Sequence, residues 1–133
     1  MSGGGGVASH EAKLRPAIDA GAAVQWRPWD LASAGVRLAV HATPGVGFGI
    51  GGLMAELQLH LAAPHDALDP SVALAAGVAL GGSGRFVVTP TARLAAGARW
   101  FAGRRLFLKV EVEGVLTRFS IAGLGIVGAG YSF

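Results

Sequence analysis

The chain contains no cysteine, which excludes disulfides and thiol chemistry. Charged residues are scarce, at 14% of the sequence, against about 25% in an average soluble domain. Long hydrophobic runs are also missing, since no apolar stretch approaches the roughly 18 to 20 residues of a transmembrane helix. Yet 52% of the residues are hydrophobic and the mean hydropathy is +0.51. A membrane role for this one-domain chain must therefore use strands, because lipid accepts only helices and closed barrels.

Several functional signatures are absent as well. The pI is near 10.2, but the longest basic run is Arg104-Arg105 and no nucleic-acid motif is present, so no nucleic-acid partner is expected. The histidines lack metal-ligand spacing, and neither a phosphate loop nor a nucleophile elbow is present. The start of the chain, residues 1–6, lacks the basic and apolar segments of a secretory signal. The sequence therefore predicts no metal, no cofactor and no catalysis.

Most of the chain alternates between an apolar face and a small or polar face, with the period of two of a β-strand. Strands are predicted at about 14–27, 31–42, 47–62, 71–81, 85–101, 104–118 and 120–133. Turn-like clusters of Gly, Pro and Asp separate them, which favours an antiparallel meander or barrel. Within 47–62, Phe48 and Ile50 fall on the polar phase, and this predicts a bulge at the neighbouring glycines.

The second face is rich in Ala and Gly and would make a poor solvated surface. It suits a narrow lumen, because small residues leave room for a few long charged side chains to cross it, and transmembrane barrels are apolar outside and polar inside. An eight-stranded barrel is filled by side chains, and charges buried there must pair. The predicted lumen charges are Arg15, Asp19, Arg37, Glu56, Arg93, Arg99, Lys109, Glu111 and Glu113, with His41 and His60 on the same face.

The final strand carries Tyr131 and Phe133 on one face and ends the chain on an aromatic residue. This resembles the terminal strand of small bacterial outer-membrane β-barrel proteins, such as the OmpA membrane domain, and the resemblance by pattern covers about residues 12–133. It implies an all-β, antiparallel up-and-down transmembrane barrel of about eight strands in the bacterial outer membrane. Outer-membrane lipids and the barrel-assembly machinery are the implied partners, with Tyr131 and Phe133 as the assembly signal.

The resemblance also implies that the C-terminus faces the periplasm. Tryptophan and tyrosine prefer membrane interfaces, so an aromatic girdle is expected from Trp26, Trp29, Trp100, Tyr131 and Phe133. Such barrels have even strand numbers, so an eighth strand must come from about residues 4–11 or from sequence upstream. Residues 1–11 are accordingly assigned as a flexible Gly-rich N-terminus or weak first strand, and 12–133 as the barrel, with a signal peptide absent from this chain.

Several functions remain open. The first is a monomeric, non-catalytic envelope barrel with a filled lumen, and a narrow channel for ions or small solutes is another. A lipid-modifying barrel enzyme would need a polar cluster on the lipid-facing rim, and none is visible. A soluble lipocalin-like barrel would instead turn an apolar set inward around an apolar ligand: Leu14, Ile18, Val36, Leu57 and Leu108. The membrane arrangement predicts that Leu108→Arg, placed at mid-span, costs about 2 to 4 kcal/mol.

Overall fold

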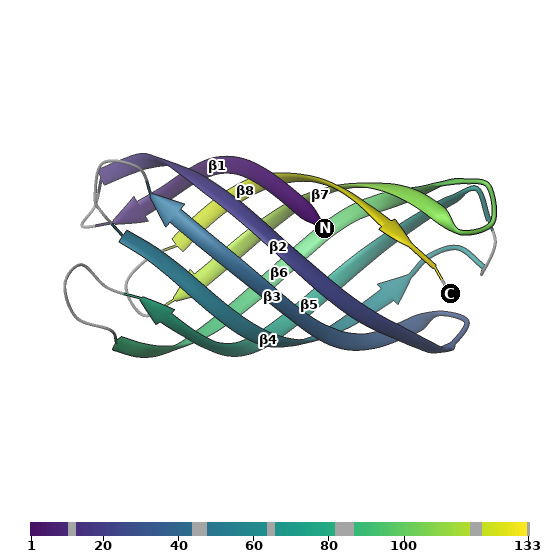
Figure 1. The fold of residues 1–133 in the computed structure, drawn as a ribbon, viewed down its shortest axis with the longest axis horizontal. Coiled ribbons are helices and arrows are strands. Elements are labelled where there is room, and N and C mark those ends of the chain that lie inside the picture. Colours follow the sequence, from purple (N-terminus) through teal and green to yellow (C-terminus); the bar gives the residue numbers. More distant parts are fainter. Residues whose placement is uncertain (11–12, 44–47, 64–65, 82–86, 118–120, 133) are drawn as a thin grey trace.

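Eight antiparallel strands close into a barrel in the computed structural model (Figure 1). The strands are β1 (Ser2–His10), β2 (Lys13–Trp29), β3 (Ala32–Thr43), β4 (Phe48–His60), β5 (Leu68–Gly81), β6 (Val87–Ala102), β7 (Leu106–Thr117) and β8 (Ile121–Tyr131). The structure describes residues 1–10, 13–43, 48–63, 66–81, 87–117 and 121–132, and side chains in all of these except 4–10, 13–17, 41, 43 and 48–51. Among the described residues, no helix is long and apolar enough to cross a membrane.

Each strand pairs with its neighbours in the sequence, and β1 closes the ring by pairing with both β2 and β8. The closing register runs from Ser2 opposite Gly128 to Ser9 opposite Ile121. The eighth strand therefore comes from the glycine-rich start of this chain, Ser2–His10. Although this segment has few apolar residues, its backbone groups are satisfied by two ladders, which is what closure of a barrel requires.

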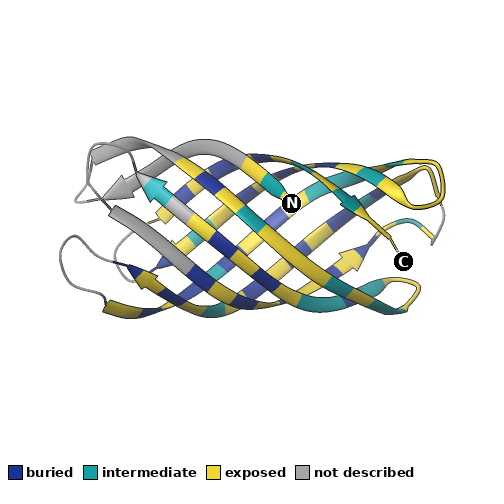
Figure 2. Ribbon diagram, viewed as in Figure 1, coloured by how far each residue is buried: buried dark blue, intermediate teal, exposed yellow. Residues whose placement is uncertain are grey.

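The period-two pattern separates the two faces of the barrel wall. Exposed and buried residues alternate along the strands, as Figure 2 shows for the described positions. Residues expected to line a lipocalin-like lumen point outward instead, with Ile18, Val36, Leu57 and Leu108 each about half exposed. The lipocalin-like arrangement is therefore wrong for these four, while Leu14 lies outside the described side chains. An exposed aliphatic belt of this extent is the surface that a transmembrane barrel presents to lipid.

The two ends of the barrel differ in their connections. At one end, here called the turn end, Asp30-Leu31 joins β2 to β3, residues 61–67 join β4 to β5, and residues 103–105 join β6 to β7. Gly103 has φ of 89°, a conformation that side chains disfavour, and it makes the last of these turns possible. At the opposite end, here called the loop end, the connections fall on residues outside the described part of the chain.

Two details of the predicted strands are corrected. No bulge interrupts β4: its register with β3 is unbroken from Leu59 opposite Ala32 to Phe48 opposite Thr43. The register shift occurs in β2 instead, between Trp26 and Trp29. The second correction concerns Leu108, which is paired with Trp100 only two residues into β7 and is not at mid-span.

Candidate functional site: the polar lumen

The centre of the lumen is organised around Arg93 of β6, whose side chain is 1% exposed. Its Nη1 lies 2.7 Å from Glu56 Oε2, and its Nη2 lies 2.7 Å from Glu111 Oε2. Its Nε donates to Glu113 Oε2 as a third ion pair. One guanidinium therefore binds three carboxylates from β4 and β7, using the fork of donors that only arginine provides.

Small residues on the intervening positions make these contacts possible. In the ladder, Glu56 is opposite Ala75, and Ala75 is opposite Arg93, so the ion pair between Arg93 and Glu56 passes over an alanine. On the other side, Ala95 and Gly97 are opposite Glu113 and Glu111. An ideal Cβ placed on Gly97 would lie 2.7 Å from Glu111 Cγ, so this glycine leaves the space that the carboxylate side chain occupies.

A second layer of charge surrounds this centre. Lys109 Nζ lies 2.7 Å from Glu111 Oε1. Arg37 is 1% exposed, and its Nη2 lies 3.7 Å from both Asp19 Oδ1 and Glu113 Oε2, which is too long for hydrogen bonds. Arg37 Nη2 is therefore near two opposite charges but makes no hydrogen bond with the described residues.

The charges of the described lumen and its mouth balance. The five cations are Arg27, Arg37, Arg93, Arg99 and Lys109, and the five anions are Asp19, Glu56, Asp69, Glu111 and Glu113. Equal numbers reduce the penalty of removing charge from water, because each ion has a counter-ion within the same low-dielectric space.

Uncharged amides connect the central cluster to the turn end. Gln25 Nε2 donates to Glu56 Oε1 and, at 2.7 Å, to Gln58 Oε1. Arg99 Nη2 donates to the side-chain oxygens of Gln25 and Gln58, and Gln58 Nε2 donates to Ser71 Oγ. The two glutamines thus carry the network across the lumen from β2 to β5.

Near the turn end, Ser33, His60 and Asp69 form a linear relay. Ser33 Oγ lies 2.9 Å from His60 Nε2, and His60 Nδ1 lies 2.7 Å from Asp69 Oδ2. This is the order of contacts in a serine-hydrolase triad. All three side chains are buried, with Ser33 only 2% exposed. None of these three side chains lines either of the two lumen cavities described below.

Arg27 lies over this relay at the mouth of the barrel. Its Nε donates to the Asp30 carbonyl at 3.0 Å, and its Nη2 donates to the Ala62 carbonyl at 2.9 Å. Its Nη1 also lies 3.6 Å from Asp69 Oδ2. One side chain thus links the turn after β2 to the turn after β4 and places a cation beside Asp69 of the relay.

Two cavities are formed by described residues of the lumen, and Arg37 lines both. The cavity toward the loop end has a volume of about 30 Å³ and is bounded by Arg37, Arg93, Asp19 and Glu113 together with apolar residues such as Met54. That volume corresponds to roughly one water molecule. The second, of about 170 Å³, lies on the turn side between β2, β7 and β8.

Part of the described lumen wall toward the loop end is an apolar cluster, which the sequence analysis did not anticipate. Leu124 and Ile126 of β8 are 2% and 1% exposed, and they form a cluster with Ala122 against Val115. Because both phases of β8 are apolar or small, its sequence alone does not show which bulky residues face inward.

The predicted lumen charges are distributed as follows. Asp19, Arg37, Glu56, Arg93, Lys109, Glu111 and Glu113 are buried in the lumen, and Arg99 is partly buried. The side chains of Arg15 and His41 lie outside those that the structure describes. The lumen residues outside the predicted set include Arg27, Ser33, Gln25, Gln58 and Asp69. The alternation could have indicated Arg27, Ser33 and the two glutamines, which share the polar phase of their strands.

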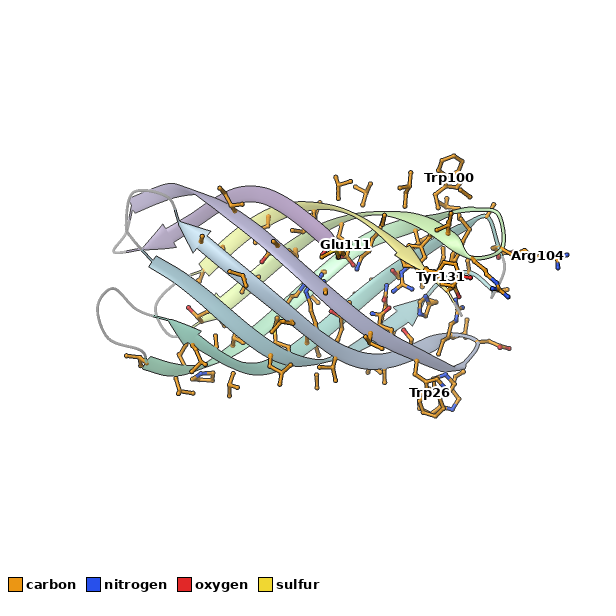
Figure 3. All side chains as sticks on the ribbon, viewed as in Figure 1. Trp26, Trp100, Arg104, Glu111 and Tyr131 are labelled. Atoms are coloured by element: carbon orange, nitrogen blue, oxygen red, sulfur yellow. The ribbon has the colours of Figure 1, made fainter. Side chains whose placement is uncertain are left out.

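The predicted girdle residues gather at the turn end. Figure 3 shows Trp26, Trp100 and Tyr131 at the same end of the barrel as Arg104, with the two tryptophans pointing away from the wall. Trp26, Trp29 and Trp100 are 72%, 61% and 56% exposed. Arg105 Nη1 donates to the Tyr131 hydroxyl at 2.8 Å. Phe133, the other predicted girdle and assembly residue, lies outside the described residues.

Within the described residues, no group of three or more His, Cys, Asp and Glu is arranged to hold a metal ion. The carboxylates of the central cluster face Arg93, Lys109 and Arg37 instead.

Comparison with known proteins identifies the fold. No protein-family model and no curated protein matches the sequence. Among solved structures, Neisserial surface protein A (NspA) superposes with a TM-score of 0.81 at 10% identity, covering 99% of this chain and 93% of that one. The outer membrane enzyme PagL gives 0.63 at 12% identity, covering 97% and 98%. The N-terminal β-barrel domain of Pseudomonas aeruginosa OprF gives 0.54 at 17% identity, covering 96% and 94%. The chain therefore has the fold of small eight-stranded outer-membrane barrels.

Proposed function

We propose that the chain is a monomeric, non-catalytic barrel of the bacterial outer membrane, with a structural role in the envelope and a lumen closed by its own side chains. The observation that carries this proposal is the central cluster, in which Arg93 is ion-paired with three carboxylates across the lumen. Beside it, the cavity toward the loop end has room for roughly one water. A narrow channel would need a hydrated path through this level.

The exposed aliphatic belt and the tryptophans at the turn end support the membrane placement, since Trp prefers the interface. With the C-terminus toward the periplasm, as the resemblance implies, the turn end is the periplasmic rim. Tyr131 and Phe133 then form the signal by which the assembly machinery inserts the barrel among outer-membrane lipids.

The test of membrane placement is folding into detergent micelles or lipid vesicles, followed by electrophoresis with and without boiling. A folded band that shifts on heating, with β-rich circular dichroism only in the amphiphile, is the expected result. Equal folding in plain buffer would overturn the membrane proposal.

The closed lumen is tested separately in planar bilayers. The folded protein is expected to give no stepwise conductance, while a porin added to the same bilayer gives steps. Reproducible conductance steps that disappear when the protein is omitted would contradict the closed lumen and favour the channel function.

Catalysis is the remaining alternative, because PagL is an enzyme with the same fold. Burial of Ser33 and the position of Arg27 over the relay support the non-catalytic role. Incubation of the folded protein with a fluorophosphonate probe is expected to leave Ser33 unmodified. Labelling that is lost in Ser33→Ala would mean that Ser33 is a reactive nucleophile.

A further inference from the structure

The larger lumen cavity, of about 170 Å³, has a positively charged lining. Three of its side chains are cationic, namely Arg37, Arg99 and Lys109, and its described lining contains no acidic residue. The described part of the lumen is balanced in charge, so this local excess arises from the way the described ions are placed. The carboxylate partner of Lys109, Glu111, lies outside the lining.

Two of these cations have donors without acceptors. Arg37 Nε and Arg99 Nε are buried and make no hydrogen bond within the described residues. Arg37 Nη2 also makes none there, but it lies 3.7 Å from Asp19 and Glu113, which line the smaller cavity. Arg37 is 1% exposed, so bulk water does not replace the missing acceptors. Buried polar groups are almost always hydrogen-bonded, and a guanidinium in particular requires oxygen acceptors.

The remaining walls shape the cavity. The Phe107 ring faces the Arg99 guanidinium, with 5.3 Å from Arg99 Cζ to the ring centroid. Gln25 offers an amide, and the wall continues along β8 to the exposed residues Ala129 and Tyr131. The volume is several times the roughly 30 Å³ that one water occupies in the liquid. It can therefore accept a tetrahedral oxyanion together with ordered water.

We propose that this cavity binds a phosphate-sized anionic group, held by charge-assisted hydrogen bonds from Arg37, Arg99 and Lys109. Such bonds favour oxyanions and are stronger than bonds to neutral acceptors. Both a free phosphate and the phosphoryl group of an anionic lipid present this chemistry. The proposal does not depend on whether the lumen is closed or the protein is non-catalytic, since the cavity is separate from the Ser33 relay.

The first test is titration of the folded wild-type protein with inorganic phosphate in zwitterionic micelles, at constant ionic strength maintained with chloride. The heat released on binding is expected to saturate with one phosphate per chain. Lys109→Gln and Arg99→Gln are each expected to weaken binding at least about tenfold. Arg104→Gln, which removes an exposed cation at the same end of the barrel, is the matched control and is expected to bind as the wild type does.

A second arm distinguishes the source of the group. Native mass spectrometry after incubation in mixed micelles of phosphatidylglycerol and phosphatidylcholine reports any retained lipid. Selective retention of phosphatidylglycerol, lost in Lys109→Gln, identifies a lipid headgroup, whereas phosphate binding without lipid retention identifies the free anion. Either result supports the site.

Two results would overturn the proposal. One is the absence of saturable binding of both probes by the wild type. The other is binding that survives in Lys109→Gln or falls equally in Arg104→Gln, since either would place the anion elsewhere. If Arg99→Gln fails the heat-shift assay for folding, Lys109→Gln decides, because Arg93 still pairs with Glu111 in that variant.

Discussion

Replacement of Arg93 by methionine tests the central cluster most directly. The change removes the common partner of Glu56, Glu111 and Glu113 and leaves four cations against five anions in the described lumen. Breaking a buried ion pair by removing one partner costs about 3 to 5 kcal/mol, because the remaining charge stays desolvated. We expect a loss of that size in the free energy of unfolding, measured by urea titration in lipid vesicles with tryptophan fluorescence. Arg104→Met, the same chemical change at an exposed site, is expected to stay within about 0.5 kcal/mol of wild type.

The double variant Arg93→Met/Glu113→Gln separates charge imbalance from loss of packing. It restores equal numbers of lumen ions, four against four, and should be at least about 1 kcal/mol more stable than Arg93→Met alone. A single variant within about 1 kcal/mol of wild type would refute the reasoning, since surface pairs are worth about that much. So would a double variant whose loss is the sum of the two single losses, because additivity means that Arg93 and Glu113 do not interact.

The remaining predictions concern the wall and the relay. Val112→Arg, on the exposed face near the middle of β7, should lower the free energy of unfolding by about 2 to 4 kcal/mol. Leu108→Arg, beside Trp100, should lower it by about 0 to 1 kcal/mol. Equal losses of unfolding free energy in lipid vesicles would contradict the proposed membrane span. Gly97→Ala should destabilise by about 1 to 3 kcal/mol through overpacking against the Val110 carbonyl oxygen and Glu111 of the neighbouring strand. Gly114→Ala, with nothing within 4 Å of its added methyl, should not, and the same urea titration compares the two variants. Ser33→Ala should leave the fold and the absence of fluorophosphonate labelling unchanged, and any labelling of wild type at Ser33 would count against the closed relay.

The sidedness of the barrel could be predicted from the sequence because it depends only on the alternation of residue types. Along β7, for example, Val110 and Val112 alternate with Lys109 and Glu111, and this order alone assigns the two faces. The structure places these valines outside and these charges inside. The same argument located the inward positions of Glu56 and Arg93 without any knowledge of their contacts.

The contacts themselves could not be predicted, because they depend on strand register and tilt. That Arg93 reaches Glu56 over Ala75 follows from two ladders, and no sequence spacing encodes it. Asp69 was missed for a different reason: Asp69-Pro70 has the composition of a turn, yet it lies inside β5. With Asp69 assigned to a loop, the relay through His60 could not be recognised.

Closure of the ring between β1 and β8 has a kinetic consequence. The ladder from Ser2 opposite Gly128 joins residues separated by almost the whole chain, and contacts of such high sequence separation form slowly. On β1 this ladder runs through Gly3, Gly4, Gly5 and Gly6, whose backbones lose the most conformational freedom on ordering and contribute no side-chain packing. We therefore expect folding to be completed at the seam between the first and last strands, and amide hydrogens of the strands to exchange first there.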